Sequence, residues 1–277
     1  MEVALGGRIG LALVVSAGRD DSGAKDQDRA CTAPGYALVA DGVSTSPGAA
    51  EAAQLWADSV AEIFSPEGLQ RVCTRLLERR EQLLERPLEL DAVQRLTPEL
   101  YVEIARFHRE RAFQSTLAAC RGSRKNETTV SLQLVICGDS AYFLVASDGA
   151  ILSTSLRGFD PQTGRFGHAG NTTVALPDDL DALSSWEGDI AVGAEILLCT
   201  DGLYDAFDTF TELHAWLKRI SGSWRRGDDD DISKEMERLH ERLVQRRGDD
   251  DIAFVFGPID QLIEKGKPEE RDEKAFL

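Results

Sequence analysis

The 277-residue sequence predicts an α+β protein with one domain, in which antiparallel strands and helices occupy different stretches of the chain. In the middle of the chain every second residue is apolar, and Val130, Leu132 and Leu134 would share one side of a strand. Stretches before and after it repeat apolar residues at helical spacing. No segment rich in Pro, Gly or Ser divides the chain, so we expect one domain over residues 1–260 and a polar tail over 261–277.

The first third of the chain predicts a strand, a loop, a second strand and then helices. Apolar runs predict strands over residues 9–16 and 35–40, and apolar residues on one helical face predict a helix over 49–64. A second helical region, interrupted at prolines, is expected between residues 66 and 122. Its helical pattern is formed by Leu100, Ile104, Phe107, Leu117 and Cys120.

The second half begins with a predicted sheet. Residues 138–140 and 148–149 have the composition of tight turns, and they would join the strands between 128 and 154 into an antiparallel meander. Residues 155–194 contain several glycines and no sustained period, which predicts a loop that faces substrate. The remaining expected elements are a strand over residues 195–200, helices over 210–220 and 232–244, a strand over 252–256 and a short helix after 261.

Composition excludes several classes of partner. The net charge of −17 repels nucleic-acid phosphates and anionic lipid, so neither nucleic acid nor a membrane is an expected partner. No stretch approaches the roughly 20 apolar residues of a membrane span, and we expect a cytoplasmic location. The five cysteines are scattered and form no CxxC pair, which argues against a disulfide framework or a zinc–thiolate site.

Three aspartates stand where buried strands are expected to end or begin. Asp41 and Asp201 each follow an apolar strand and precede a helix, and Asp250 comes just before the last strand. The pair at Asp148 lies between two strands and is better explained as a turn. The acidic run at residues 228–231 precedes a helical pattern, so we expect it to cap a helix and face solvent.

Aspartates without a histidine or cysteine partner offer only hard oxygen ligands, which suit Mg²⁺ or Mn²⁺ better than zinc or copper. Two such ions about 3.5–4 Å apart can share a bridging water and hold a phosphoryl group for in-line attack. A calcium-binding role is excluded because the sequence lacks the Asp-x-Asp-x-Asp-Gly loop with its distal glutamate. The sequence therefore predicts a phosphoryl-transfer site that uses metal ions.

Six short motifs, in their order and approximate spacing, make this chain similar to the type 2C protein phosphatases. They are Asp26-Gln-Asp28, Val39-Ala-Asp41-Gly42-Val43, Thr128-Thr129, Gly138-Asp139-Ser140, Thr200-Asp201-Gly202 and Gly248 to Ala253. The resemblance runs from about residue 10 to residue 257. It implies two antiparallel sheets stacked face to face, with helices on both outer faces. It also implies that a hydroxide bridging two Mn²⁺ or Mg²⁺ ions hydrolyses phosphoserine and phosphothreonine in proteins.

The resemblance also assigns site residues. The metal ligands it implies are Asp41 as the bridging carboxylate, the Gly42 carbonyl, Asp201 and Asp250. Asp139 would help Asp201 hold a third ion, and Asp28 would orient a catalytic water. The family usually has an arginine that grips the substrate phosphate at the position of Gly23. Arg19 or Lys25 is the candidate replacement.

The expected partners are a phosphorylated protein substrate and a cognate Ser/Thr kinase. One alternative is a phosphatase dedicated to a single regulatory partner, such as a sigma-factor-control protein. A second is a pseudophosphatase, in which the fold survives as a binding module. The glycine at position 23 leaves this second alternative open, whereas the presence of Asp41, Asp201 and Asp250 argues against it.

Overall fold

The computed structural model describes residues 13–17, 27–84, 103, 106–107, 109–156, 159–160, 165–166, 174–246 and 251–264. Most of its strands form two five-stranded antiparallel sheets. Sheet I has the order β1 (Leu13–Ala17), β12 (Ile252–Pro258), β11 (Glu195–Cys199), β6 (Ala141–Val145) and β7 (Ile151–Thr154). Sheet II has the order β10 (Ser184–Ala191), β5 (Thr129–Cys137), β4 (Ser115–Arg124), β3 (Tyr36–Gly42) and β2 (Arg29–Ala33). Two short strands, β8 (Phe159–Asp160) and β9 (Arg165–Phe166), pair with each other.

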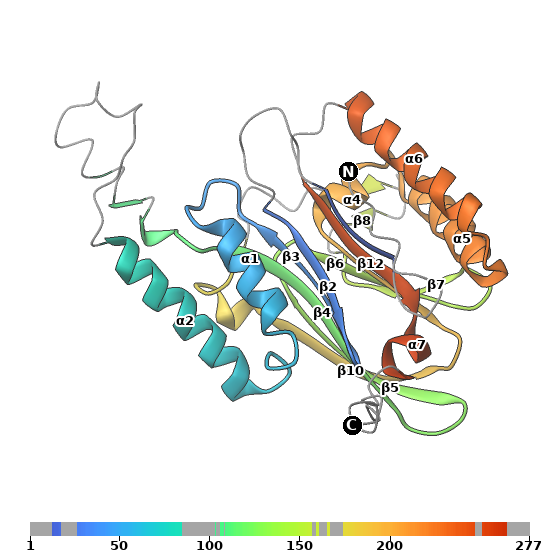
Figure 1. Cartoon of the computed structure of the whole chain (residues 1–277), viewed down its shortest axis with the longest axis horizontal. Coiled ribbons are helices and arrows are strands. Elements are labelled where there is room, and N and C mark those ends of the chain that lie inside the picture. Colours follow the sequence, from blue (N-terminus) through green and yellow to red (C-terminus); the bar gives the residue numbers. More distant parts are fainter. Residues whose placement is uncertain are drawn as a thin grey trace, which may run out of the picture.

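Helices cover the outer faces of the two sheets (Figure 1). Helices α1 (Ala49–Asp58) and α2 (Pro66–Leu84) lie on sheet II, and α5 (Phe210–Arg226) and α6 (Asp229–Arg246) lie on sheet I. The shorter helices are α4 (Asp201–Asp205), α7 (Ile259–Glu264) and the 3₁₀ turn η2 (Leu180–Ala182). The expected sandwich of two sheets between helices is confirmed. None of the described helices is long and apolar enough to cross a membrane.

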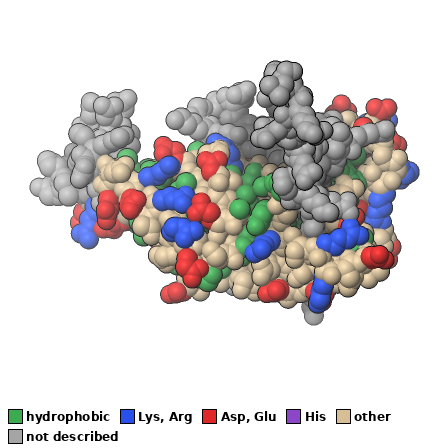
Figure 2. All heavy atoms as spheres, turned by 60° about the horizontal axis from the view of Figure 1, so that its bottom comes forward, with side chains coloured by type: hydrophobic (Ala, Val, Ile, Leu, Met, Phe, Trp, Pro, Cys, Tyr) green, Lys and Arg blue, Asp and Glu red, His purple; other side chains and the backbone are tan. Residues whose placement is uncertain are grey.

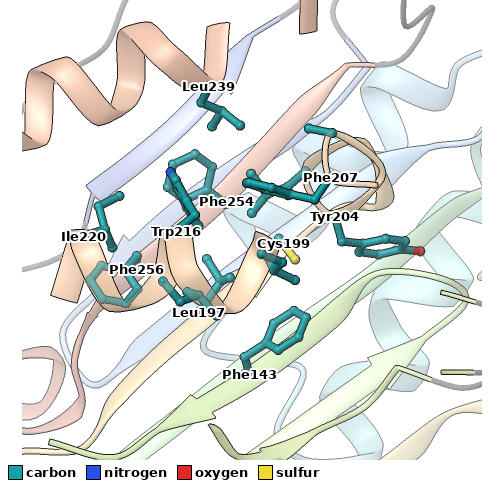
Figure 3. Close-up of a cluster of buried hydrophobic side chains, with 14 of the residues drawn as sticks. Phe143, Leu197, Cys199, Tyr204, Phe207, Trp216, Ile220, Leu239, Phe254 and Phe256 are labelled. Carbon is teal, nitrogen blue, oxygen red and sulfur yellow. The ribbon is translucent and has the colours of Figure 1, made fainter. Parts of the chain in front are cut away.

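Alternating side chains along the strands build three separate layers of core. In β6, Leu144 faces the space between the sheets, whereas Phe143 faces α5. In β3, Val39 faces the space between the sheets and Leu38 packs towards α1. The outer layer on sheet I is rich in aromatic rings, and Trp216 meets Phe254 edge to face at 5.9 Å (Figure 3). Inner strands such as β6 and β11 are therefore buried on both faces, which holds their ends rigidly.

One predicted helix is wrong. Leu117 and Cys120, which the helical pattern included, lie in strand β4, the central strand of sheet II. Residues Ser115 to Cys120 are all buried, because one face of β4 packs between the sheets and the other packs under α1. A strand buried on both faces shows no alternation, so its apolar run cannot be distinguished from helix by period alone.

The predicted meander is correct only in part. β6 and β7 do form a hairpin, and Gly149 in its turn has a φ of 81°. β5, however, belongs to sheet II, so the turn after it carries the chain from one sheet to the other. Gly138 in this crossover also has a φ of 81°, and a Cβ there would lie 2.6 Å from the Thr116 side chain. A glycine-containing turn such as the one at Gly138 fits a hairpin and a crossover equally well. Here β5 pairs with β4 and β10 in sheet II, so the turn after it must cross to sheet I.

Two further elements differ from expectation. Helix α1 ends at Asp58 rather than near residue 64, although Val60 and Ile63 in the following turns are still buried. Residues 155–194 contain the edge strand β10 in addition to turns. Every second residue of β10 is exposed, because one face of the strand meets solvent, whereas Trp186 and Ile190 on the other face pack against the core between the sheets.

Candidate metal centre

The antiparallel register brings the candidate acids to one end of the sandwich. In sheet II, Asp41 near the end of β3 pairs with Thr116 at the start of β4, whose next residue pairs with the last residue of β5. In sheet I, Cys199 at the end of β11 pairs with residues near the starts of β6 and β12. Asp139 and Asp201 follow β5 and β11 by two residues each. The acids therefore converge from both sheets.

Three of these carboxylates form a cluster. One oxygen from each of Asp41, Asp139 and Asp201 lies within 4.8 Å of the corresponding oxygens of the other two. All three side chains are half-buried, which keeps them open to a small ion. Asp250 lies outside the described residues, so its predicted place in this cluster remains a prediction.

Close backbone contacts fix the sheet I side of the cluster. Asp201 is the first residue of α4, and a Cβ on the next residue, Gly202, would lie 2.1 Å from the Asp251 carbonyl oxygen. Only glycine allows this approach. The backbone N–H and the hydroxyl of Thr200 both donate to the Ala253 carbonyl, at 3.0 and 3.3 Å, and the Ala253 backbone N–H donates to the Thr200 hydroxyl at 3.0 Å. The start of α4 is therefore locked to the chain just after residue 250.

Gly42 has a similar role on the sheet II side. A Cβ at this position would lie 2.9 Å from the backbone of Ala49, the first residue of α1. The backbone of Gly42 at the end of β3 is therefore packed closely against the helix and next to Asp41 in the chain. Gly42 is the next residue after Asp41 in the chain, so its backbone carbonyl lies close to the cluster, as the ligand role implied by the resemblance requires.

Asp139 lies among groups that position it. The Tyr204 hydroxyl donates a hydrogen bond of 3.0 Å to the Asp139 backbone carbonyl. The buried hydroxyls of Thr116 and Ser140 are 2.7 Å apart, directly beneath the crossover turn. Burial raises the pKa of the Asp139 carboxyl, and hydrogen bonds from its own backbone and from Thr116 partly offset this. Asp139 is therefore held where its charged form needs a cation.

Tyr204 remains a neutral hydrogen-bond donor near the cluster. Burial raises the pKa of its phenol, and the negative charges of Asp201 and Asp139 raise the pKa further. Its ring lies at the edge of the aromatic core of sheet I, with the hydroxyl pointing away from that core (Figure 3). Tyr204 thus links the core on the outer face of sheet I to the turn that contains Asp139.

The segment before β2 also approaches this end of the molecule. The backbone N–H of Gln27 donates a hydrogen bond of 2.7 Å to the Asp251 side chain. The next residue, Asp28, is only 1% exposed. The candidate phosphate-binding residues Arg19 and Lys25 lie outside the described residues.

The acidic run at 228–231 is located elsewhere, at the start of α6. The Asp228 side chain accepts a hydrogen bond of 3.0 Å from the Asp231 backbone N–H, as a helix cap does. Asp229 and Asp230 are exposed. The prediction that this run begins a helix rather than binding the metal at the strand ends agrees with its position.

The chemistry of the cluster fits divalent cations. Three carboxylates this close together repel one another in the absence of a cation, and Asp139 Oδ1 is buried without a hydrogen-bond partner among the described residues. All the ligands are oxygens, which favours Mg²⁺ or Mn²⁺. Sequence reasoning missed Thr116 and Tyr204, because one lies in the misassigned β4 and the other matches no motif.

Comparison with known proteins identifies the family. The family model for Protein phosphatase 2C matches residues 15–243. In solved structures, PppA, a key regulatory component of T6SS in Pseudomonas aeruginosa, is 18% identical, with a TM-score of 0.56 over 90% of this chain and 97% of that chain. The Mycobacterium tuberculosis serine/threonine phosphatase PstP/Ppp is 17% identical, with a TM-score of 0.56 over 89% and 97% of the two chains. A bacterial serine phosphatase is 13% identical, with a TM-score of 0.56 over 90% and 97%.

No curated protein of similar sequence was found. The low identities to the solved structures establish a shared fold, whereas the family match extends over most of the sequence. The predicted resemblance is thereby confirmed, and the chain belongs to the protein phosphatase 2C family.

Proposed function

We propose that this chain hydrolyses phosphoserine and phosphothreonine in proteins, with Mn²⁺ or Mg²⁺ as the resident ions. The observation that carries the proposal is the cluster of Asp41, Asp139 and Asp201 at the shared end of the two sheets. In a member of the protein phosphatase 2C family, such a cluster supports a metal-dependent protein phosphatase. Divalent ions bound there would activate water and neutralise the charge of the phosphoryl group.

The residues of the chain have distinct roles in this proposal. Asp41 and the Gly42 carbonyl would bind metal from the end of sheet II, Asp201 would bind it from the end of sheet I, and Asp250, just before β12, would be a further ligand. Asp139 and Asp201 would hold a third ion, because their carboxylates belong to the same cluster. Asp28, buried beside the segment that contacts Asp251, would accept a hydrogen bond from the attacking water and orient it.

The proposed substrate is a phosphorylated protein, and the proposed partner is the Ser/Thr kinase that phosphorylates it. PppA is described as a key regulatory component of T6SS, and a regulatory role is proposed for this chain as well. On the coloured part of the face in Figure 2, Lys and Arg side chains lie among Asp and Glu side chains rather than in a stripe. This distribution supports a protein rather than a nucleic acid as the partner.

We also propose a reducing compartment such as the cytoplasm. All five cysteines are unpaired thiols, and four of them are buried. Burial raises the pKa of the Cys73 thiol to about 11 and that of Cys120 to about 12, so both stay protonated. Unpaired buried thiols are typical of proteins that fold in reducing surroundings.

A hydrolysis assay tests the proposed activity. p-Nitrophenyl phosphate and a phosphothreonine peptide are incubated with the full chain in Mn²⁺, in Mg²⁺ and in chelator. We expect turnover with either metal and none with chelator. Asp201→Asn should remove turnover, and Asp229→Asn on the exposed start of α6 is the matched control. If metal binds with unchanged affinity but no phosphopeptide is hydrolysed, the chain is a binding module and the proposal is wrong.

A further inference from the structure

Asp251 lies where separate segments of the candidate site meet. It is half-buried and directly precedes β12, so it is the chain neighbour of the predicted ligand Asp250. Its backbone carbonyl oxygen would lie 2.1 Å from a Cβ on Gly202, the residue after Asp201. Its carboxylate accepts the hydrogen bond of 2.7 Å from the Gln27 backbone N–H, across 224 residues of sequence. The main chain and the side chain of Asp251 therefore contact two different segments of the site.

The hydrogen bond to Gln27 helps to fix Asp28, the residue that is proposed to orient the attacking water. Asp28 follows Gln27 in the chain and is 1% exposed. Its backbone carbonyl accepts a hydrogen bond of 2.7 Å from Arg29 Nη1. Arg29 Nε in turn donates to Gln54 of α1 at 2.8 Å. Asp28 is thus held from both sides, by Asp251 through the preceding residue and by α1 through the following one.

A precise position is important for Asp28, because a group that orients water acts by direction. Such a group works only within about 0.5 Å and 10–20° of its productive geometry, and a misplacement of 1 Å can cost roughly 100-fold in rate. A carboxylate acceptor makes a hydrogen bond from a backbone N–H shorter and stronger than a neutral acceptor does. The distance of 2.7 Å between Gln27 N and Asp251 Oδ2 is in the range of such bonds.

We propose that Asp251 is a positioning residue for the hydrolysis reaction. Its carboxylate holds the Gln27 backbone, so that the Asp28 carboxyl stays directed at the attacking water. The inference rests on the proposed function, because Asp28 has a water to orient only if the chain hydrolyses phosphate esters. In this role Asp251 contacts neither substrate nor metal, and it acts through its oxygen acceptor rather than through its charge.

Two substitutions separate the acceptor from the charge. Asp251→Asn keeps an oxygen that can accept the Gln27 N–H but removes the negative charge, and Asp251→Ala removes both. With a phosphothreonine peptide at saturating Mn²⁺, Asp251→Ala should lose at least about tenfold in kcat with KM changed less than about twofold. Asp251→Asn should stay within about threefold of the wild type in kcat. The matched control is Asp228→Ala, because Asp228 is also half-buried and its side chain accepts a backbone N–H at 3.0 Å, but at the start of α6.

Two further measurements do not depend on turnover. In the metal-free full chain, hydrogen exchange of the Gln27 amide is followed by NMR. We expect exchange at least about tenfold faster in Asp251→Ala, and a rate near that of the wild type in Asp251→Asn and Asp228→Ala. Calorimetric titration with Mn²⁺ should give a dissociation constant for Asp251→Ala within about threefold of the wild type. Its melting temperature should fall by less than about 4 °C; if Asp251→Ala does not fold, Asp251→Ser, a milder truncation, takes its place with the same expected results.

Several outcomes would overturn this role of Asp251. Normal kcat in Asp251→Ala, with the Gln27 amide exchanging fast, would show that Asp28 needs no such support. Loss of turnover in Asp251→Asn, with the Gln27 amide still protected, would mean that the charge acts directly, as that of a metal ligand does. A fall in Mn²⁺ affinity that matches the fall in kcat would have the same meaning. These results concern Asp251 alone, whereas a wild-type chain without turnover in any metal would contradict the proposed function and this role with it.

Discussion

The Tyr204 hydroxyl and the backbone carbonyl of Asp139 form a hydrogen bond of 3.0 Å that joins the two sheets at the metal end of the sandwich. Tyr204 lies on α4, one turn after Asp201, and α4 follows β11 of sheet I. Asp139 follows β5 of sheet II. The bond therefore fixes two of the clustered carboxylates relative to each other, although Tyr204 itself is not a ligand candidate.

Replacing this hydroxyl should weaken metal binding while the fold is kept. Tyr204→Phe removes a hydrogen bond worth about 1 kcal/mol, so Mn²⁺ affinity should fall about three- to tenfold. Isothermal titration calorimetry measures the change. Tyr142→Phe is the matched control, because its hydroxyl is also inside the sandwich but contacts Ser153 at 3.1 Å. Equal losses in both variants would show that Tyr204 acts only through general packing.

Asp201→Asn should nearly abolish turnover. The amide keeps one oxygen ligand but loses the negative charge that offsets closely spaced cations. The loss of transition-state stabilisation should be at least about 3 kcal/mol, or more than about 100-fold in kcat. Without metal the variant should unfold at the same temperature as the wild type or higher, because the repulsion within the cluster is relieved. Normal turnover at saturating Mn²⁺ would exclude Asp201 from catalysis, and collapse of the metal-free fold would indicate a structural role.

Asp139→Asn should stabilise the metal-free protein in a pH-dependent way. Burial raises the pKa of this carboxyl in the folded state, so its contribution to stability is present at acidic pH and is lost as the pH rises through the folded pKa. The neutral amide removes that loss. In urea unfolding with chelator, we expect the variant to exceed the wild type in free energy of unfolding at pH 7.5, with the gap closing towards pH 4. A gap independent of pH would contradict this origin. With Mn²⁺ present, the variant should gain less stability than the wild type.

Asparagine replacements over residues 228–231 should leave the Mn²⁺ requirement unchanged. Asn caps a helix about as well as Asp, and the run lies at the start of α6 rather than in the carboxylate cluster. Stability should change by less than about 1 kcal/mol, since the ion pairs of Asp231 are exposed at the surface. The concentration of Mn²⁺ giving half-maximal turnover is the measurement. A large increase in it would mean that this run, and not Asp250, supplies a metal ligand.

The sequence was sufficient to predict a strand where the spacing of its apolar residues matches the burial of its two faces. β5 has one face between the sheets and one that is mostly half-buried, and its alternation of Val130, Leu132 and Leu134 predicted it correctly. β4 is buried on both faces, so its continuous apolar run does not distinguish a strand from a helix, and the helix predicted there is wrong. The turn at Gly138 fits a hairpin locally, and only the pairing of β5 with β4 and β10 shows that it crosses between sheets.

The residues of the candidate site also fall into those that local sequence patterns predict and those that they do not. Asp41 and Asp201 were predictable, because each carboxylate follows an apolar strand that leads into a helix. Asp139 came from family resemblance alone, since its local sequence describes a turn. The groups that position it, Thr116 and Tyr204, depend on contacts across 24 residues or more of sequence, and no local pattern specifies them.

The chain between Leu156 and Val174 is anchored at both ends in different layers. At its start, Leu156 packs into the core beneath α5, and Ser155 exchanges hydrogen bonds with the Tyr142 backbone. At its end, Leu176 pairs with Ser115 through two backbone hydrogen bonds, and Asp178 holds Arg80 of α2 through two more, of 2.6 and 2.9 Å. Both ends of this stretch are therefore fixed points of the framework, one in the half of the sandwich built on sheet I and the other in the half built on sheet II.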